Sequence, residues 1–415
     1  MPNAAEAPPL HDVTVLDLTV ALAGPVATLL LGGLGARVIK VEEPGAGDPC
    51  RENAPFFGQG GAKLTRQRKD DLSVTGFNRL RNKLGVTLNL KHPEARGVLT
   101  DLARTADIVV ENFSPGTLDR LGAGYDFFRS TNPRIVHCSI TGFSSNPPPG
   151  STRALDTTIQ ALSGVMYLSG KPDDPPIRVG LTIADLTAAQ FAVIGVLAAL
   201  HHARSTGVGQ HVDISMLGAL TALVASEAYE AMERCGAPIR TGQTVQRLAP
   251  FGVYRASDGY VAICAYTDRM AHSLFAAMGQ ADLAASPHFQ TRDARVEHSA
   301  EVDATIEKWT RPRPMSEIVK KLQEAAIPVA EVRDPKKAVR DPGVIARGET
   351  VPLSHPQYGA VDDIYAMGLP IQFSESRAGF DQPPPALGEH NQAVYGGILG
   401  YNKERMDELK SHGVI

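Results

Sequence analysis

Apolar residues in the first half of the chain gather in short runs, separated by segments with helical periodicity. Four runs are typical of buried strands: Val13–Leu18, Arg37–Val41, Ile108–Val110 and Ile135–Ile140. Between them, Pro25 stands at a favoured first-turn position of a helix through Leu34, and a second helix is expected from His92 to about Arg104. Strands that alternate with helices predict βαβ units, and therefore an α/β fold whose large domain is Rossmann-like with a mostly parallel sheet.

The pattern changes beyond about Arg240, where a β-hairpin with an Asp258-Gly259 turn is followed by helices and a strand. The segments are Phe251–Arg255, Tyr260–Ala265, Ser299–Thr310, Met315–Ala326 and Pro328–Val332. A chain of 415 residues exceeds the size at which a single core stops growing. We therefore expect residues 1–224 to begin a large α/β domain, residues 225–330 to form a smaller α+β domain, and residues 331–415 to return to the large domain.

Three further stretches bear on the class of protein. Residues 58–83 are polar and glycine-rich, which predicts a long surface loop. The longest uncharged apolar stretch, Leu186–Leu200, is too short to span a bilayer and contains Thr187 and Gln190, so it predicts a buried core helix. The first twelve residues lack the basic and apolar segments of a signal peptide. We expect a soluble, cytoplasmic protein that is not inserted in a membrane.

Charge and cysteine content exclude other classes. The net charge of −4 argues against a nucleic-acid binder, which would carry a strongly basic surface. Adjacent His201 and His202 would point in different directions on a helix, so they do not predict a metal site. The four cysteines are scattered without zinc-binding spacing, and we expect them to be reduced thiols: Cys50, Cys138, Cys235 and Cys264.

The turn after the first predicted strand tests for dinucleotide binding. That fingerprint needs several glycines between the first strand and the first helix, where the backbone meets the pyrophosphate. Here the turn from Val20 to Pro25 contains one glycine, Gly24, and the glycine cluster comes after the helix. An NAD- or FAD-dependent oxidoreductase is therefore disfavoured, and we expect no permanently bound cofactor.

Two features could act on carboxylates or phosphates. Basic residues cluster from Lys63 to Lys83, opposed by Asp70 and Asp71, which fits either an anion-binding site or a solvated loop. Asp185 precedes the apolar helix, where aspartate is a favoured N-cap. A carboxylate at a helix N-terminus is also held ionised by the helix dipole, as a nucleophile requires. From spacing alone, both interpretations of Asp185 stay open.

Short motifs stand in order along nearly the whole chain. They are VLDL at 15–18, AGP at 23–25, LGARVIKVE at 34–42, GD at 47–48, NK at 82–83, VENFSPG at 110–116 with Arg120, Asp156 with QALSG at 160–164, Asp185, GQHVDIS at 209–215 and LGEH at 387–390. Each motif is weak alone. Together, in this order, they resemble family III CoA-transferases, the CaiB/BaiF group that includes formyl-CoA transferase.

The resemblance implies an enzyme that moves CoA from an acyl-CoA to a small carboxylic acid. It implies that Asp185 attacks the donor thioester, and that a mixed anhydride and then an aspartyl-CoA thioester follow. It also implies that Arg120 faces the nucleotide phosphates of CoA. Thr141 stands where formyl-CoA transferase has a lysine near the active site, and we include it among the CoA-binding candidates. The positions that match CoA contacts in the family are Lys83, Asn112, Phe113 and Arg120.

Departures from formyl-CoA transferase bear on the substrate. Leu22, Glu43 and Thr141 replace its glutamine, arginine and lysine, so formyl-CoA and oxalate are not expected. Succinyl-CoA is a common donor in the family, and a dicarboxylate is the expected acceptor, with aryl-substituted succinates among the candidates. The candidate anchors for a second carboxylate are Arg178 and Arg247, with Arg153 and His211 as further possibilities.

Other functions stay open beside the transferase. An α-methylacyl-CoA racemase would share the fold but uses a His-Asp pair as its two bases, and Leu155 stands where the histidine before Asp156 would be. A non-catalytic CoA-binding subunit of a heteromer would lack the nucleophile, whereas Asp185 is present. Since family members form interlocked dimers, the resemblance implies a homodimer or a heterodimer with a related chain.

Overall fold

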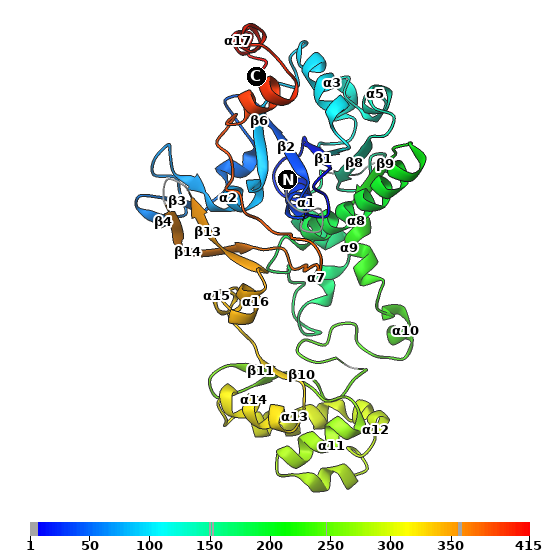
Figure 1. Cartoon of the computed structure of the whole chain (residues 1–415). Helices are drawn as coiled ribbons and strands as arrows, with labels where there is room; N and C mark the ends of the chain where they lie inside the picture. Colours follow the sequence, from blue (N-terminus) through cyan, green and yellow to red (C-terminus); the bar gives the residue numbers. More distant parts are fainter. Residues whose placement is uncertain (1–6, 149–150, 152, 246, 356–358) are drawn as a thin grey trace. The chain divides into compact units, whose positions relative to one another are not determined.

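The computed structural model describes residues 7–148, 151, 153–245, 247–355 and 359–415 (Figure 1). The chain forms two compact units. The first comprises Met1–Ser163, Gly180–Leu223 and Val339–Ile415, and the second comprises Gly164–Val179 and Val224–Ala338. Residues 164–179, which the sequence pattern assigned to the large domain, are thus grouped with the second unit.

A six-stranded sheet, parallel throughout, forms the centre of the first unit. Its order is β6-β2-β1-β7-β8-β9, so the chain extends the sheet to one side of β1 and then to the other. This arrangement confirms the predicted α/β class, and it includes β6, for which the hydrophobic pattern predicted no strand. The strands are β1 (Thr14–Asp17), β2 (Arg37–Glu42), β6 (Lys83–Thr87), β7 (Ile108–Glu111), β8 (Val136–Thr141) and β9 (His211–Ser215).

Helices cover both faces of the parallel sheet (Figure 1). Helix α1 (Ala23–Gly33) and helix α8 (Ile183–Thr206) pack on each other and on one face. Helix α3 (Ala95–Thr105) and helix α5 (Tyr125–Thr131) lie over the other face. The core on that side also contains Leu409 of α17 (Lys403–Ser411), which comes from the far end of the chain.

Helix α8 is, among the described residues, the one helix long and apolar enough to cross a membrane by length and composition. It packs against β8 and β9, and one side of it is buried, including Ala188, Ala192, Val196 and Ala199. Small residues at these positions let the helix lie close to the sheet. This packing is that of a core helix in an α/β domain, as the sequence predicted for Leu186–Leu200.

Residues 58–83 do not form one long loop, so that prediction was wrong. Short strands β3 (Phe56–Gly58), β4 (Gly61–Lys63) and β5 (Leu72–Ser73) form an antiparallel sheet, and α2 (Val74–Leu80) follows. The Ser73 hydroxyl caps α2 by accepting a hydrogen bond from the Gly76 N–H at 3.0 Å. Phe77 of α2 packs in a small core with Leu353, between α2 and the hairpin β13 (Thr350–His355)–β14 (Gly359–Met367). These partners lie far away in the sequence, and a local pattern cannot reveal them.

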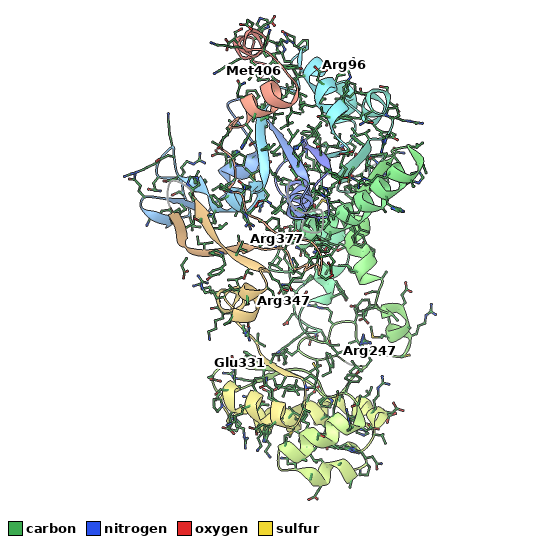
Figure 2. All side chains as sticks on the ribbon, viewed as in Figure 1. Arg96, Arg247, Glu331, Arg347, Arg377 and Met406 are labelled. Carbon is green, nitrogen blue, oxygen red and sulfur yellow. The ribbon has the colours of Figure 1, made fainter. Side chains whose placement is uncertain are left out.

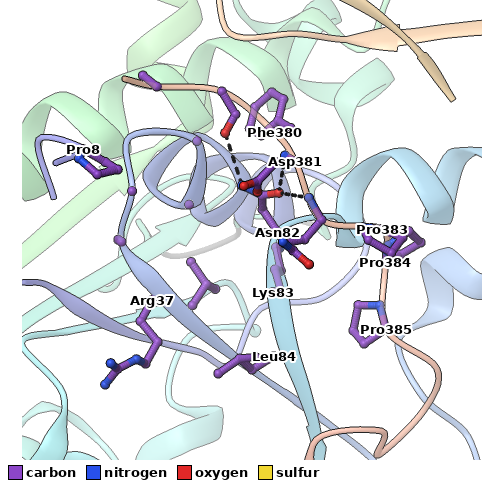
Figure 3. A pocket seen from close by; sticks show the side chains of 18 of the residues that line it. Pro8, Arg37, Asn82, Lys83, Leu84, Phe380, Asp381, Pro383, Pro384 and Pro385 are labelled. Atoms are coloured by element: carbon purple, nitrogen blue, oxygen red, sulfur yellow. Dashed lines mark hydrogen bonds between the residues drawn. The ribbon is translucent and has the colours of Figure 1, made fainter. Parts of the chain in front are cut away.

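The C-terminal segment is joined to the start of β6 by Asn82. Asn82 has a φ of 56°, and its Oδ1 accepts hydrogen bonds from the backbone N–H groups of Asp381 and Gln382 at 3.0 and 2.8 Å. Its Nδ2 donates to the Gly379 carbonyl at 3.2 Å (Figure 3). A cavity of about 820 Å³ lies here, lined by residues that begin β2 and β6. Because the strands are parallel, this is the amino edge of the sheet, away from the edge where strands deliver functional loops.

The second unit has its own antiparallel sheet and core. Strands β10 (Phe251–Arg255), β11 (Tyr260–Cys264) and β12 (Val329–Glu331) pair in that order, and the first two form the predicted hairpin. Helices α11 (Asp268–Ala277), α13 (Ser299–Thr310) and α14 (Met315–Glu324) pack against it. Their apolar faces bury a core that includes Tyr254, Ile263, Phe275, Ile306 and Leu322.

Candidate active site

The loop that joins β1 to α1 lies at the switch point of the parallel sheet. From β1 the chain passes first to β2 on one side, whereas β7 pairs with β1 on the other. In open α/β sheets such a reversal leaves a crevice at the carboxyl ends of the strands, which is where ligands bind. Gly24 lets the loop fold tightly, because a Cβ there would lie 2.3 Å from the Cβ of Thr19.

Side chains from several elements hold this loop by its backbone. Asn112, which follows β7, accepts from the Val20 N–H at 2.7 Å and donates to the Val20 carbonyl at 2.8 Å. Asp48 accepts from the Ala21 N–H at 3.0 Å, and Arg79 of α2 donates to the Ala21 carbonyl at 3.0 Å. Ala21 has a φ of 68°, a conformation that a residue with a Cβ keeps only when its surroundings impose it.

Asp185 also contacts this loop, from the first turn of α8. Its carboxylate accepts a hydrogen bond from the N–H of Ala23, the first residue of α1. The N-cap of α8 is Thr182, whose side chain forms no capping bond. Instead, Asp156 at the start of α6 (Asp156–Leu162) accepts from the Ala184 N–H at 2.9 Å. The N-cap interpretation of Asp185 was therefore wrong, because a carboxylate from another helix supplies the cap.

The surroundings of Asp185 suit a reactive carboxylate. Burial, and then the nearby charge of Asp156, raise the pKa of Asp185 to about 6, while Arg79 and the Ala23 N–H act in the opposite direction. Within the described residues, Asp185 forms no ion pair. At neutral pH it is thus an ionised, partly desolvated carboxylate without a salt-bridge partner, and such perturbed groups gather at functional sites.

A buried ionic network lies beneath the loop and includes Lys83, one of the predicted CoA contacts. The Lys83 Nζ is buried and donates to Asp17 at 2.9 Å, to the Pro25 carbonyl at 2.9 Å and to the Thr28 hydroxyl at 2.7 Å. Lys40 pairs with Asp48 and Asp17 on the other side. Burial tends to raise the pKa of Asp17, but the two lysines lower it to about 2. In this structure Lys83 is an internal counter-ion rather than a surface group facing a ligand.

The predicted basic cluster at 63–83 does not gather at one site. Arg66 pairs with Glu52 at 2.9 Å, and Arg81 donates to the Met367 carbonyl at 2.6 Å and lies over the Phe380 ring. Proximity in the sequence was misleading because these residues lie on a strand, a turn and a helix that face different neighbours. Arg79 alone of these is hydrogen-bonded to the loop beside Asp185.

Arg120 lines a cavity of about 270 Å³ with other basic residues. It is exposed on α4 (Thr117–Arg120), and Lys91, His92 and Arg96 line the same cavity. Arg96 is labelled in Figure 2. Residues 90–93 follow β6 and residues 120–123 follow β7, so the cavity lies at the carboxyl edge of the sheet. Lys91 and Arg96 were not predicted as site residues, although the basic residues around the start of α3 were a visible signal.

The remaining predicted residues lie in other surroundings. Phe113 is partly buried against the core beneath α3. Thr141 is buried at the end of β8, and it lines a polar cavity of about 80 Å³ with His211, whose Nε2 is 2.9 Å from the Ser139 hydroxyl.

The arginines proposed as carboxylate anchors divide between the units. Arg153 is exposed in the first unit, and Arg178 and Arg247 are exposed in the second. Arg247 donates to both carboxylate oxygens of Glu227 at 2.9 Å (Figure 2). As for metals, no group of three or more His, Cys, Asp or Glu in the described part of the chain is placed to hold an ion.

A switch-point loop beside a helix-terminal carboxylate is typical of ligand-binding α/β enzymes but does not define their chemistry. The sequence profile of CoA-transferase family III matches residues 10–391, and the chain belongs to this family. It is therefore a CoA-transferase, an enzyme class whose substrates are CoA thioesters.

Named relatives cover almost the entire chain. It is 34% identical to succinyl-CoA–D-citramalate CoA-transferase of Chloroflexus aurantiacus over 98% of each chain. It is 35% identical to succinyl-CoA:mesaconate CoA-transferase of Haloarcula marismortui, over 96% of this chain and 99% of the relative. Its fold is similar to the crystal structure of a CaiB/BaiF family protein from Brucella suis, with a TM-score of 0.81 and 30% identity over 95% of this chain and 100% of the other.

Proposed function

We propose that this enzyme transfers CoA from succinyl-CoA to a dicarboxylate acceptor through an aspartyl-CoA thioester on Asp185. The observation that carries the proposal is the Asp185 carboxylate, which lies at the N-terminal turns of α8 and α1 with a raised pKa and without an ion-pair partner among the described residues. The relatives named for succinyl-CoA as donor and for citramalate or mesaconate as acceptor support this choice of substrates.

The reaction balances without an added acid, base or oxidant. The Asp185 carboxylate attacks the thioester carbonyl of succinyl-CoA, the C–S bond breaks, and CoA thiolate leaves a mixed anhydride. The thiolate then attacks the aspartyl carbonyl and releases succinate, which gives the aspartyl-CoA thioester. The acceptor carboxylate repeats these two steps in reverse, so that the acceptor leaves as its CoA thioester and the Asp185 carboxylate is restored.

The neighbours of Asp185 have roles that follow from their positions. Each attack at the aspartyl carbonyl places negative charge on an oxygen, and the Ala23 N–H, already bonded to this carboxylate, is in place to stabilise that charge. Asp156 caps α8 and so fixes the turn that carries the nucleophile. Asn112 and Asp48 fix the loop on the opposite side, which keeps the donor N–H in position.

The basic cavity is our candidate for the phosphates of CoA. Arg120, Lys91 and Arg96 supply charge at the carboxyl edge of the sheet, and arginine matches phosphate geometry with paired N–H donors. Arg120→Ala is expected to raise the KM for succinyl-CoA about tenfold and to leave the KM for the acid acceptor within twofold. A selective rise in the acid KM would contradict this assignment.

A trapping experiment tests the nucleophile. The enzyme is incubated with succinyl-CoA without acceptor, treated with hydroxylamine or borohydride, digested and mapped by mass spectrometry. We expect modification at Asp185 and none in Asp185→Asn. The matched control is Asp126→Asn, which removes an exposed carboxylate from the first turn of α5 and should leave labelling unchanged. Labelling elsewhere, or full activity of Asp185→Asn, would overturn the proposal.

The acceptor is then identified by direct competition. Citramalate, mesaconate, glutarate, oxalate, benzylsuccinate and the monocarboxylate acetate are offered at equal concentration to the preformed aspartyl-CoA thioester, without a trapping reagent, and the CoA esters are resolved by chromatography. The proposal expects a dicarboxylate of four or more carbons to discharge the enzyme fastest. Preference for a monocarboxylate, or for oxalate, would contradict the substrate assignment.

A further inference from the structure

Arg79 is a half-buried arginine whose hydrogen-bond donors are mostly not used by the described protein groups. One of its five N–H donors is engaged, by the Ala21 carbonyl at 3.0 Å. Within the described residues it takes part in no ion pair, although the neighbouring arginines do form strong contacts. Arg51, for comparison, donates to both carboxylate oxygens of Glu42 at 2.7 Å. Because this guanidinium is partly open to solvent and has no counter-ion among the described residues, its remaining N–H donors are available to an anionic ligand.

The backbone of the loop places Arg79 near the nucleophile. Arg79 bonds to Ala21 and Asp185 bonds to Ala23. Two residues of chain span at most about 7 Å, so both side chains reach the same short stretch of loop. They are nevertheless more than 4 Å apart, since no salt bridge joins them. The interval is therefore too wide for a direct ion pair, and each group still influences the charge of the other.

The charges around Asp185 and Arg79 indicate which kind of substrate group binds between them. In the aspartyl-CoA thioester Asp185 carries no charge, so the negative charge that an approaching substrate carboxylate meets there is that of the nearby Asp156. The guanidinium of Arg79 is the group that offsets this repulsion, and its planar pairs of N–H donors match a carboxylate. The basic cavity of Arg120 lies elsewhere, beyond β6 and β7, so the CoA phosphates do not require Arg79.

We propose that Arg79 binds the carboxylate of the acid substrate as it reacts at Asp185, and so sets the preference of the enzyme for acids as acyl acceptors. This rests on the proposed function. In the step concerned, a carboxylate oxygen held by Arg79 attacks the carbonyl of the Asp185 thioester. The C–S bond breaks, CoA thiolate departs, and an anhydride forms without any proton transfer.

Exchange of labelled succinate into succinyl-CoA tests the proposal and does not require the acceptor to be identified first. Wild type, Arg79→Gln, Arg79→Lys and the control Arg104→Gln are compared, the control being an exposed arginine of α3 paired with Asp101. We expect Arg79→Gln to raise the KM for succinate about 10- to 100-fold, because a charge-assisted hydrogen bond is lost. The KM for succinate of Arg79→Lys should lie between those of wild type and Arg79→Gln. The Kd for CoA should stay within twofold in all four proteins.

Chemical rescue separates binding from loop support. In Arg79→Ala, added guanidinium at millimolar concentration should restore part of the exchange by lowering the KM for succinate. If instead the KM values for succinyl-CoA and succinate rise together and thermal stability falls, Arg79 only supports the Ala21 loop and the inference is overturned. An unchanged succinate KM in Arg79→Gln would overturn it as well. A wild type that neither exchanges succinate nor labels at Asp185 would overturn the proposed function itself, and this inference with it.

Discussion

Replacing Asp185 by asparagine is expected to abolish CoA transfer and, at the same time, to stabilise the folded protein above pH 7. The native surroundings raise the pKa of this carboxyl from 3.8 to about 6, mainly through burial and then through the charge of Asp156. Between pH 4 and pH 6 the native state therefore binds the proton more tightly than the unfolded chain does, and its stability falls as the pH rises through that window. Asparagine resembles the protonated acid and avoids this loss.

The size of the effect follows from the shift. About two pKa units at 1.36 kcal/mol each correspond to roughly 3 kcal/mol when Asp185 is ionised. The side chain is partly accessible to water, and screening reduces the value, so we expect a gain of about 1–3 kcal/mol in the free energy of unfolding at pH 8. At pH 4.5 both proteins carry an essentially neutral group at this position, and the difference should shrink to a fraction of that.

Urea unfolding at pH 8 and pH 4.5, followed by circular dichroism, measures the difference. Asp126→Asn is the control, because an exposed first-turn carboxylate of α5 should change stability by less than about 1 kcal/mol at either pH. If Asp185→Asn is less stable than wild type at pH 8, or if its gain in unfolding free energy is the same at both pH values, then burial does not destabilise the ionised carboxylate. In that case the argument from its raised pKa fails.

Three further results are expected. The kcat/KM for transfer should fall about tenfold per pH unit below pH 6 as Asp185 protonates, and a profile flat to pH 4.5 would contradict its raised pKa. Lys83→Met should lower the free energy of unfolding by about 3–5 kcal/mol, because Asp17 loses a buried partner, whereas a loss of CoA affinity at full stability would restore Lys83 as a ligand contact. Asn82→Ala should cost about 2–4 kcal/mol and expose the segment after residue 379 to limited proteolysis, and unchanged cleavage would show that the segment is held by other contacts.

The elements of the fold that depend on local hydrophobic patterns and turn motifs were largely predicted from the sequence. Apolar runs such as Val13–Leu18 marked the strands of the parallel sheet, and the Asp258-Gly259 turn marked the hairpin of the second unit. Strand β6 escaped because it begins with Lys83, a charge that can be buried only because Asp17 lies opposite it, 66 residues earlier in the chain. Helix α2 escaped for a similar reason, since its apolar face is covered by a hairpin far along the sequence.

The sequence singled out Asp185 as a candidate nucleophile but did not predict the residues that surround it. Asp185 could be proposed from its position before an apolar helix and from the motifs around it. Whether Asp185 caps the helix could not be predicted. The residue that caps the Ala184 N–H is Asp156, which lies 28 residues earlier in the chain. Arg79 counted as one basic residue among several, since its contact with Ala21 spans 58 residues. Sequence spacing identified residue types, and long-range backbone contacts decided their roles.

The C-terminal segment has a consequence for how the protein is made. Val394, Tyr395, Leu409 and Val414 are buried in the same core as Leu16 of the first strand. A nascent chain emerges from its N-terminus, so the core on this face of the sheet stays incomplete until residue 414 has been synthesised. Most of the second unit, residues 224–338, has emerged by then and can fold first. The unit that contains Asp185, although its synthesis begins first, is thus the unit that is completed last.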